Sequence, residues 1–163
     1  MRRRIIILAL IAACSDDAAT TPACTTSTPL EGAIFGETFA PTASRARFST
    51  RYPGQLDVLL REHPVDCSES GSTPQEDFAQ MTVFIPKALQ VVGAPRLGDR
   101  ADTVECTAIR VTHPGGTPLT QQASAADGTL CVTAIDDAHI AGAIEIDLED
   151  VTAHGVFEAT ICR

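Results

Sequence analysis

Three short segments near the C-terminus constrain the fold of this chain more than any other feature. They are residues 129–135, 139–147 and 152–161. The middle segment alternates, so that Ile140 and Ile144 fall on one side while charged and polar residues fall on the other, as in a strand with one face in the core. Because only short acidic turns separate the segments, they are expected to pair as an antiparallel meander.

The rest of the chain also consists of short apolar runs between turn signals. A helix start is predicted at residues 73–77, where proline and acidic residues follow a threonine, but the strand at 81–85 limits it to a single turn. Residues 117–127 are expected to form a polar loop. We therefore predict an all-β fold, an antiparallel β-sandwich or flattened barrel with one short helical turn. Further strands or extended segments are expected at 33–39, 45–52, 55–60, 81–85, 91–98 and 104–111.

The position of the last turn of the meander sets the register of its strands. Paired residues of the last two strands then have numbers that sum to about 299, so that His139 faces Ala159 and His154 faces Ile144. Phe157 is expected to lie in the core with the isoleucines, and the two histidines are expected on the solvent side.

The four histidines do not form a metal-binding pattern. In this register His139 and His154 lie about five residues apart along the strands, at ~3.3 Å per residue, so they cannot share one ion. His63 and His113 each precede a proline, as is typical of turns. We expect no metal site and no cofactor.

The N-terminus has the features of an export signal. Arg2, Arg3 and Arg4 precede the apolar run 5–13, which is too short to span ~30 Å of hydrocarbon. The stretch Ile11-Ala12-Ala13-Cys14 resembles the bacterial lipobox, whose cysteine is diacylated and becomes the mature N-terminus. An ordinary secretory signal or an uncut anchor is the alternative. The predicted organisation is a signal peptide at 1–13, lipidated Cys14 with a flexible tether to residue 29, and a β domain at 30–163.

Charge excludes two classes of partner. The chain has a net charge of −9, and loss of the signal arginines leaves nine basic residues against 21 acidic ones, a net charge of about −12. No segment is expected to gather arginines on one face, so nucleic-acid binding is excluded. Anionic headgroups repel such a surface, so the expected membrane partner is reached only through the acyl chains.

Six cysteines in an exported chain predict structural disulfides. Lipidation of Cys14 leaves five, so one stays unpaired within the chain. The register places Cys131 about seven residues, or ~23 Å, from Cys162, too far for a disulfide. Other arrangements stay open, since five cysteines allow fifteen ways to form two bridges. The preferred pairs are Cys106 with Cys131 and Cys67 with Cys162, which leaves Cys24 as the odd thiol.

No residue pattern typical of a catalytic site stands out. The acidic clusters at 76–77, 136–137 and 147–150 are typical of turns and a helix start, and they lack the spacing of a calcium loop. There is no Gly-x-Ser-x-Gly motif and no marked nucleophile. With no Trp and one Tyr, aromatic platforms for sugars or bases are scarce. We expect the chain not to be an enzyme.

The order of these features resembles a known group of proteins. The lipobox and tether are followed by Gly32-Ala33-Ile34-Phe35-Gly36-Glu37, by a strand closed at Cys67, and by a meander ending in Ala159-Thr160-Ile161-Cys162. This layout resembles the small lipoproteins of unknown function found in myxobacteria and related Gram-negative predators. With Ser15 after the lipidated cysteine, the resemblance implies the outer membrane.

The expected function is a non-catalytic binding or structural role in the cell envelope, with the ligand open. The first alternative is an inhibitor or binding module for a basic secreted protein, because the chain is strongly acidic. A small hydrolase is the third possibility.

Overall fold

The computed structural model describes residues 26–65, 67–68, 76–93, 97–98, 103–125 and 127–163. The predicted signal peptide, lipidated Cys14, Cys24 and nearly all of the tether lie outside these residues. The start of the helical turn predicted at 73–77 also lies outside them, while Glu76 and Asp77 are not helical and lead directly into a strand. No helix in the described part has the length and apolar character needed to cross a bilayer.

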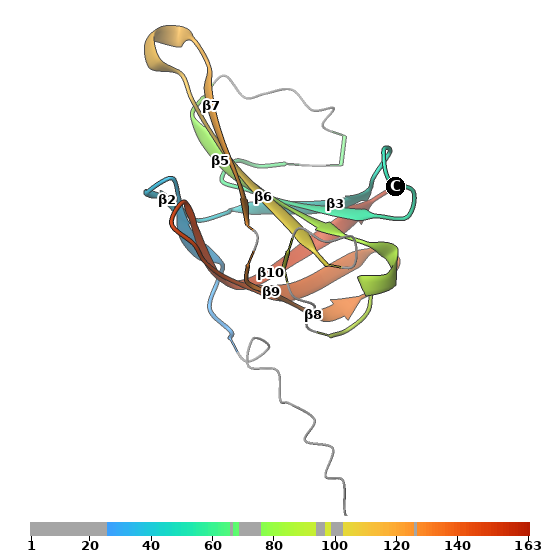
Figure 1. Ribbon diagram of the computed structural model, residues 1–163. Helices are drawn as coiled ribbons and strands as arrows, with labels where there is room; N and C mark the ends of the chain where they lie inside the picture. Colours follow the sequence, from blue (N-terminus) through green and yellow to red (C-terminus); the bar gives the residue numbers. More distant parts are fainter. Residues whose placement is uncertain (1–25, 66, 69–75, 94–96, 99–102, 126) are drawn as a thin grey trace, which may run out of the picture.

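Ten strands form one sheet that curls until its two halves face each other (Figure 1). The first layer, in spatial order, contains β3 (Ala43–Phe48), β4 (Leu56–Arg61), β5 (Phe78–Ile85), β6 (Glu105–Thr112) and β7 (Leu119–Ala125). The second contains β2 (Glu37–Phe39), β1 (Glu31–Ile34), β10 (Val151–Cys162), β9 (His139–Asp147) and β8 (Thr129–Ile135). The predicted all-β class is confirmed, with short 3-10 turns at Lys87–Leu89 and Pro114–Gly116 as the helical elements of the described chain.

Two features of the sheet differ from the sequence-based expectations. The predicted polar loop at 117–127 contains β7, which pairs antiparallel with β6 along seven residues. This strand forms the edge of its layer and is largely exposed, so it lacks the apolar alternation that marks the other strands. In addition, β10 pairs with β3 in parallel, which joins the two layers in an otherwise antiparallel sheet.

The core lies between the layers and contains the predicted face of the meander. Ile140, Ile144 and Phe157 from the second layer are buried, as are Val58 and Val83 from the first. Alternation with a period of two places these residues on one side of each strand and polar residues on the other. The two layers therefore stabilise each other through one continuous core.

The observed meander register agrees with the predicted sum of 299, although the individual partners differ by one residue. His139 faces Thr160 and His154 faces Glu145, in place of the expected Ala159 and Ile144. Both histidines lie on the solvent side, with side chains 53% and 61% exposed.

Gly142 illustrates how the core fits together. A Cβ atom on this residue would lie 2.3 Å from the carbonyl oxygen of Cys131 and 3.1 Å from the ring of Phe157, its partner on β10. The glycine therefore leaves space for the aromatic ring against β9. Any larger residue would force the ring or a strand to move.

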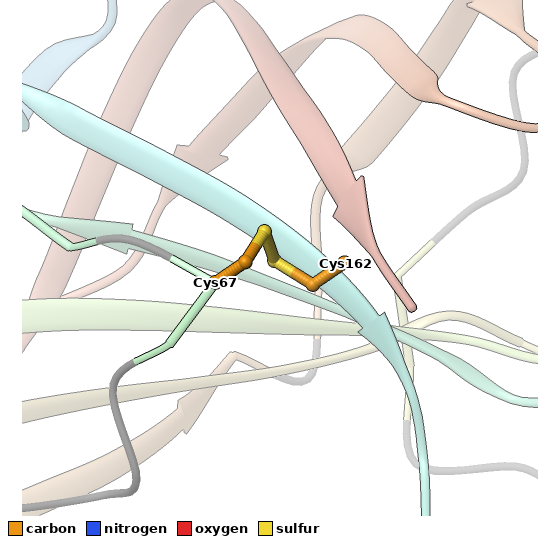
Figure 2. Close-up of a disulfide and its surroundings, with 2 residues drawn as sticks. All are labelled: Cys67 and Cys162. Carbon is orange, nitrogen blue, oxygen red and sulfur yellow. A yellow bond between two sulfur atoms is a disulfide. The ribbon is translucent and has the colours of Figure 1, made fainter.

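One disulfide links the two layers at the edge of the first. Cys67 follows β4 and Cys162 ends β10, and their Cα atoms are 5.2 Å apart beside strand β3 (Figure 2). The structure thus contains the predicted Cys67–Cys162 pair. Because it closes a loop of 95 residues, loop-closure entropy assigns it a stabilisation of about 4–5 kcal/mol.

The other predicted bridge, Cys106–Cys131, is not formed. Cys106 is a free, buried thiol that points into the core from β6. Cys131 faces the opposite way, into a small separate cluster with Ala143 and Val156 on the outer side of the meander. It is disulfide-bonded, and its partner lies outside the described residues. The pairing failed because β6 and β8 are not neighbours but lie in different layers, and Cys131 points away from the core that Cys106 enters.

Candidate ligand-binding groove

A groove of about 460 Å³ lies on the outward face of the first layer, opposite the core. Its charged lining consists of Arg45 and Arg47 from β3, with Asp57 and Arg61 from β4. The described lining therefore carries a net positive charge within a chain whose overall charge is −9. This volume is within the range typical of small-molecule sites.

Strand geometry explains why the arginines meet. Arg45 and Arg47 are two residues apart in β3 and so project from the same face, while Ala46 between them points into the core. Arg45 pairs with Leu59 of β4, and Arg61 lies two residues further along that strand, on the same side. Diagonal neighbours of this kind have Cβ atoms about 7–8 Å apart. The three arginines therefore lie along one face of β3 and β4, on either side of the Leu59 position.

This grouping corrects the expectation that no arginines gather on one face. The Arg45-x-Arg47 spacing in a segment that alternates was the available signal for the first two residues. Arg61 joins them only through the pairing of β3 with β4, which the local sequence does not encode.

Arg61 is held in a defined orientation. Its Nε and Nη2 donate hydrogen bonds to Oε1 of Gln80 at 3.2 and 2.8 Å, and its guanidinium carbon lies 5.1 Å from the centroid of the Phe78 ring. The side chain is 8% exposed. A fixed, partly desolvated guanidinium group binds an anion with less loss of side-chain entropy than a mobile surface arginine.

Arg45 and Arg47 differ in exposure. Arg45 is buried and already engaged by neighbouring groups, whereas Arg47 is exposed. Asp57, directly opposite Arg47, accepts a hydrogen bond from the side-chain amide of Gln55 at 2.7 Å. The side chain of Arg47 makes no hydrogen bond or ion pair with another residue in the described part of the chain. It is therefore the groove cation best placed to meet an incoming anion.

Apolar side chains continue the groove across β5 and β6. Phe78 and Val111 are opposite each other and are buried, although both point away from the main core. Ile109 lies beside them on β6, and Thr120 of β7 ends the row. With strands about 4.8 Å apart, Ile109 lies about 10 Å from the β4 arginine. The groove thus has a cationic end and an apolar end.

A shallower depression of about 380 Å³ adjoins the groove and shares Arg47, Asp57 and Phe84 with it. Tyr52, the sole tyrosine of the chain, lies there with the guanidinium carbon of Arg51 5.3 Å from its ring centroid. This position makes Tyr52 an intrinsic spectroscopic reporter for the groove.

His63 and His113 meet at Asp77, whereas His139 and His154 contact separate acidic residues. His113 Nδ1 lies 3.1 Å from Asp77 Oδ1, His154 pairs with Glu31 at 3.5 Å, and His139 lies 3.9 Å from Asp136. The fourth, His63, contacts the carbonyl oxygen of Asp77 at 3.0 Å through Nε2. The described residues include no group of three His, Cys, Asp or Glu side chains arranged to hold a metal ion.

Two titratable groups of the described residues have a shifted pKa, and neither lies in the groove. Burial raises the pKa of the Cys106 thiol to about 12, which keeps it protonated and unreactive. The backbone N–H groups of Ala138 and His139 donate to Asp136 Oδ1 at 2.6 and 2.8 Å and lower the pKa of this exposed carboxyl group. The acidic pair at 136–137 therefore builds a turn, as the sequence predicted.

Comparison with known proteins finds no match to a protein family, to a curated protein or to a solved structure. Functional inference therefore depends on the geometry and charge of the groove.

Proposed function

We propose that this chain is a non-catalytic binding protein of the cell envelope, held to a membrane by lipid on Cys14 and binding an anionic ligand in the arginine groove. The observation that carries the proposal is the convergence of Arg45, Arg47 and Arg61 on one concave face of an otherwise acidic chain. Guanidinium groups match carboxylate and phosphate oxygens through paired N–H donors.

The groove also supports binding over catalysis. Its charged groups are arginines with one aspartate, and arginine neither donates nor accepts protons near neutral pH. The single described free thiol is buried Cys106, on the core side of β6. Arginines on a rigid sheet suit recognition, because the strands hold them in place before the ligand arrives.

The proposed attachment to a membrane is tested by cell fractionation. We expect the wild-type chain in the detergent-soluble membrane fraction and the Cys14→Ala chain in the soluble fraction or as an uncleaved precursor. Recovery of the variant from membranes at the wild-type level would refute lipid attachment through Cys14.

The proposed anion binding is tested by adding simple ions to the lipidated full chain in phosphatidylcholine nanodiscs. Sulfate and acetate should change Tyr52 fluorescence saturably at constant ionic strength, whereas tetramethylammonium should not. The change should weaken in Arg47→Gln and persist in Arg163→Gln, which removes the same charge from an exposed site paired with Asp137. Equal responses to anions and cations would refute an anion site.

A second candidate function follows from the other layer. Residues 111–162 contain no Lys or Arg, and Glu145, Asp147 and Glu158 are exposed on β9 and β10. Such a surface attracts a basic protein. If this is the binding surface, Glu145→Lys should weaken salt-dependent binding of a cationic lysozyme and Arg47→Gln should not.

A further inference from the structure

The free edge of the first layer lies along β7 (Leu119–Ala125). We propose that this strand pairs antiparallel with β7 of a second copy of the chain, so that the first layers of the two copies form one continuous sheet. This pairing goes beyond the proposed anion binding and does not depend on the arginine groove.

β7 differs from the other edges of the sheet. Three described strands, β2, β7 and β8, have a single strand partner. The edge at β2 is three residues long and carries exposed Glu37, and on the free side of β8 Val132 exchanges two backbone hydrogen bonds with Gly93, at 2.7 and 3.0 Å. Short length, charge and coverage protect an edge from pairing with another chain. β7 has seven residues without charge or proline, and no backbone hydrogen bond within the described chain reaches its free side.

The surroundings of this edge suit a second copy. The β6–β7 hairpin projects from the rest of the sheet at the upper left of Figure 1. Residues 114–126 contain no charged side chain, in a chain whose net charge is −9. Two such chains repel each other over their acidic surfaces, but a contact along β7 places no like charges of this strand opposite each other.

The strand is complementary to itself in one register. A two-fold axis perpendicular to the sheet keeps the outward face outward, and all seven residues pair only when the axis passes through the middle residue, Gln122. Gln122 then faces Gln122 of the second copy, and Thr120 faces Ser124. Their amide and hydroxyl groups can hydrogen-bond across the two strands.

The same register covers an exposed apolar side chain. Leu119 is 55% exposed, and it shares a strand face with Ala125, which belongs to the core. In the proposed dimer Leu119 faces Ala125 of the second copy, at the margin of that copy's core. The residue that needs cover and the residue that provides it lie on one strand, which favours a second copy over an unrelated peptide as the partner.

Disulfide crosslinking of the lipidated full chain in isolated membranes tests this register. Gln122→Cys brings two cysteines opposite each other, with Cα atoms about 5 Å apart. The matched control Ser124→Cys, on the same face of the strand, separates them by four residues, or ~13 Å. After mild oxidation we expect a band of twice the chain mass for Gln122→Cys and only the wild-type level for Ser124→Cys. Mixing Ser124→Cys with Thr120→Cys should restore the band.

Charge at the axis gives an independent test. Gln122→Lys and Gln122→Glu each place like charges opposite each other, and each should weaken association of two differently tagged full chains about fivefold. An equal mixture of the two variants should associate at least as well as the wild type. Because the substitutions change the net charge in opposite directions, a loss in both cannot come from net charge. Unaltered thermal unfolding shows that the fold is retained.

The outcomes separate this inference from the proposed function. If Gln122→Cys gives no dimer band, or if Ser124→Cys gives as much as Gln122→Cys, the pairing is refuted. A crosslink to a chain of another mass would make the partner a different protein and would refute self-pairing. Adding Arg47→Gln to Gln122→Cys should leave the dimer band unchanged, so failure of the anion site leaves the pairing intact.

Discussion

The two layers of the sheet share one core but present opposite charges to solvent. The outward face of β3 and β4 carries Arg45, Arg47 and Arg61, whereas the outward face of β9 and β10 carries exposed acidic residues. No Lys or Arg occurs between residues 111 and 162, which contain eight acidic residues. The net charge of the whole chain therefore averages two surfaces of opposite charge, which attract different partners.

The layers also differ in how their outward faces are covered. The arginine layer is hollowed into a groove lined by charged and apolar side chains. In the meander, Cys131 and Ala143 are 0% and 2% exposed although they face away from the main core. Residues 28–30 reach this region, where Val156 N donates to Thr28 O at 2.9 Å and Leu30 N donates to Val156 O at 3.2 Å. The end of the tether thus pairs with β10 of the acidic layer.

The largest expected effect tests whether the layers depend on one core. Ile144→Asp in the meander and Val83→Asp in the arginine layer should each abolish cooperative unfolding, because an unpaired buried charge costs several kcal/mol. The outward substitutions His154→Ala and Arg47→Gln should change the free energy of unfolding by within about 0.5 kcal/mol. Thermal unfolding followed by circular dichroism measures all four. Loss of one layer with the other intact would show that they fold separately.

The next effect concerns the covalent link between the layers. Cys162→Ser, with Cys67→Ser to avoid a free thiol, should lower the free energy of unfolding by about 2–5 kcal/mol. The loop of 95 residues gains conformational entropy when the unfolded chain is no longer crosslinked. Denaturant unfolding with and without reductant measures the loss. If reductant destabilises the double variant as much as the wild type, another bridge is responsible.

The sequence predicted the meander well and the arginine layer poorly, for a physical reason. Short turns link β8, β9 and β10, so register follows from counting, and the predicted sum of 299 holds. In the arginine layer, long connections precede β5 and β6 and a parallel pairing joins β3 to β10, and local patterns do not encode these features. β7 was assigned to a loop because it is polar and largely exposed, and the position of Arg61 beside the β3 arginines was missed because it depends on strand pairing.

The cysteines show the same division. Cys67–Cys162 was preferred because the meander register excluded Cys131 and because Cys67 follows a strand while Cys162 lies near the chain terminus, and the structure contains this pair. Cys106–Cys131 was predicted on the expectation that the two residues lie in consecutive strands, and it failed because β7 intervenes, β6 and β8 lie in different layers, and Cys131 points away from the core. The sequence shows which residues of one strand share a face. It does not show how the sheet curls, and so it does not show which way each face points.

The third prediction concerns the covered side of the meander. Cys131 forms a disulfide whose partner is not among the described cysteines, and a lipidated Cys14 has no thiol to offer. We expect non-reducing peptide mapping to link Cys131 to Cys24, and native-state alkylation to leave buried Cys106 unmodified. A free Cys24 in the mapped protein would contradict the assignment. A Cys24–Cys131 link would place the anchor on the acidic layer, so that the arginine groove faces away from it.

The smallest expected effect lies at the turn between β8 and β9 on the acidic layer. Hydrogen bonds from the N–H groups of Ala138 and His139 hold the pKa of Asp136 below its ordinary value. A carboxyl group with a lowered folded-state pKa stabilises the fold above its unfolded pKa of about 3.9, and this contribution is lost as the pH falls through the folded value. Asp136→Asn should therefore lower stability slightly near pH 7 and make no difference in strong acid. The control Asp147→Asn, on an exposed strand position, corrects for the loss of one carboxylate. A gap between wild type and Asp136→Asn that persists unchanged at low pH would show that the side chain acts through turn geometry and not through its charge.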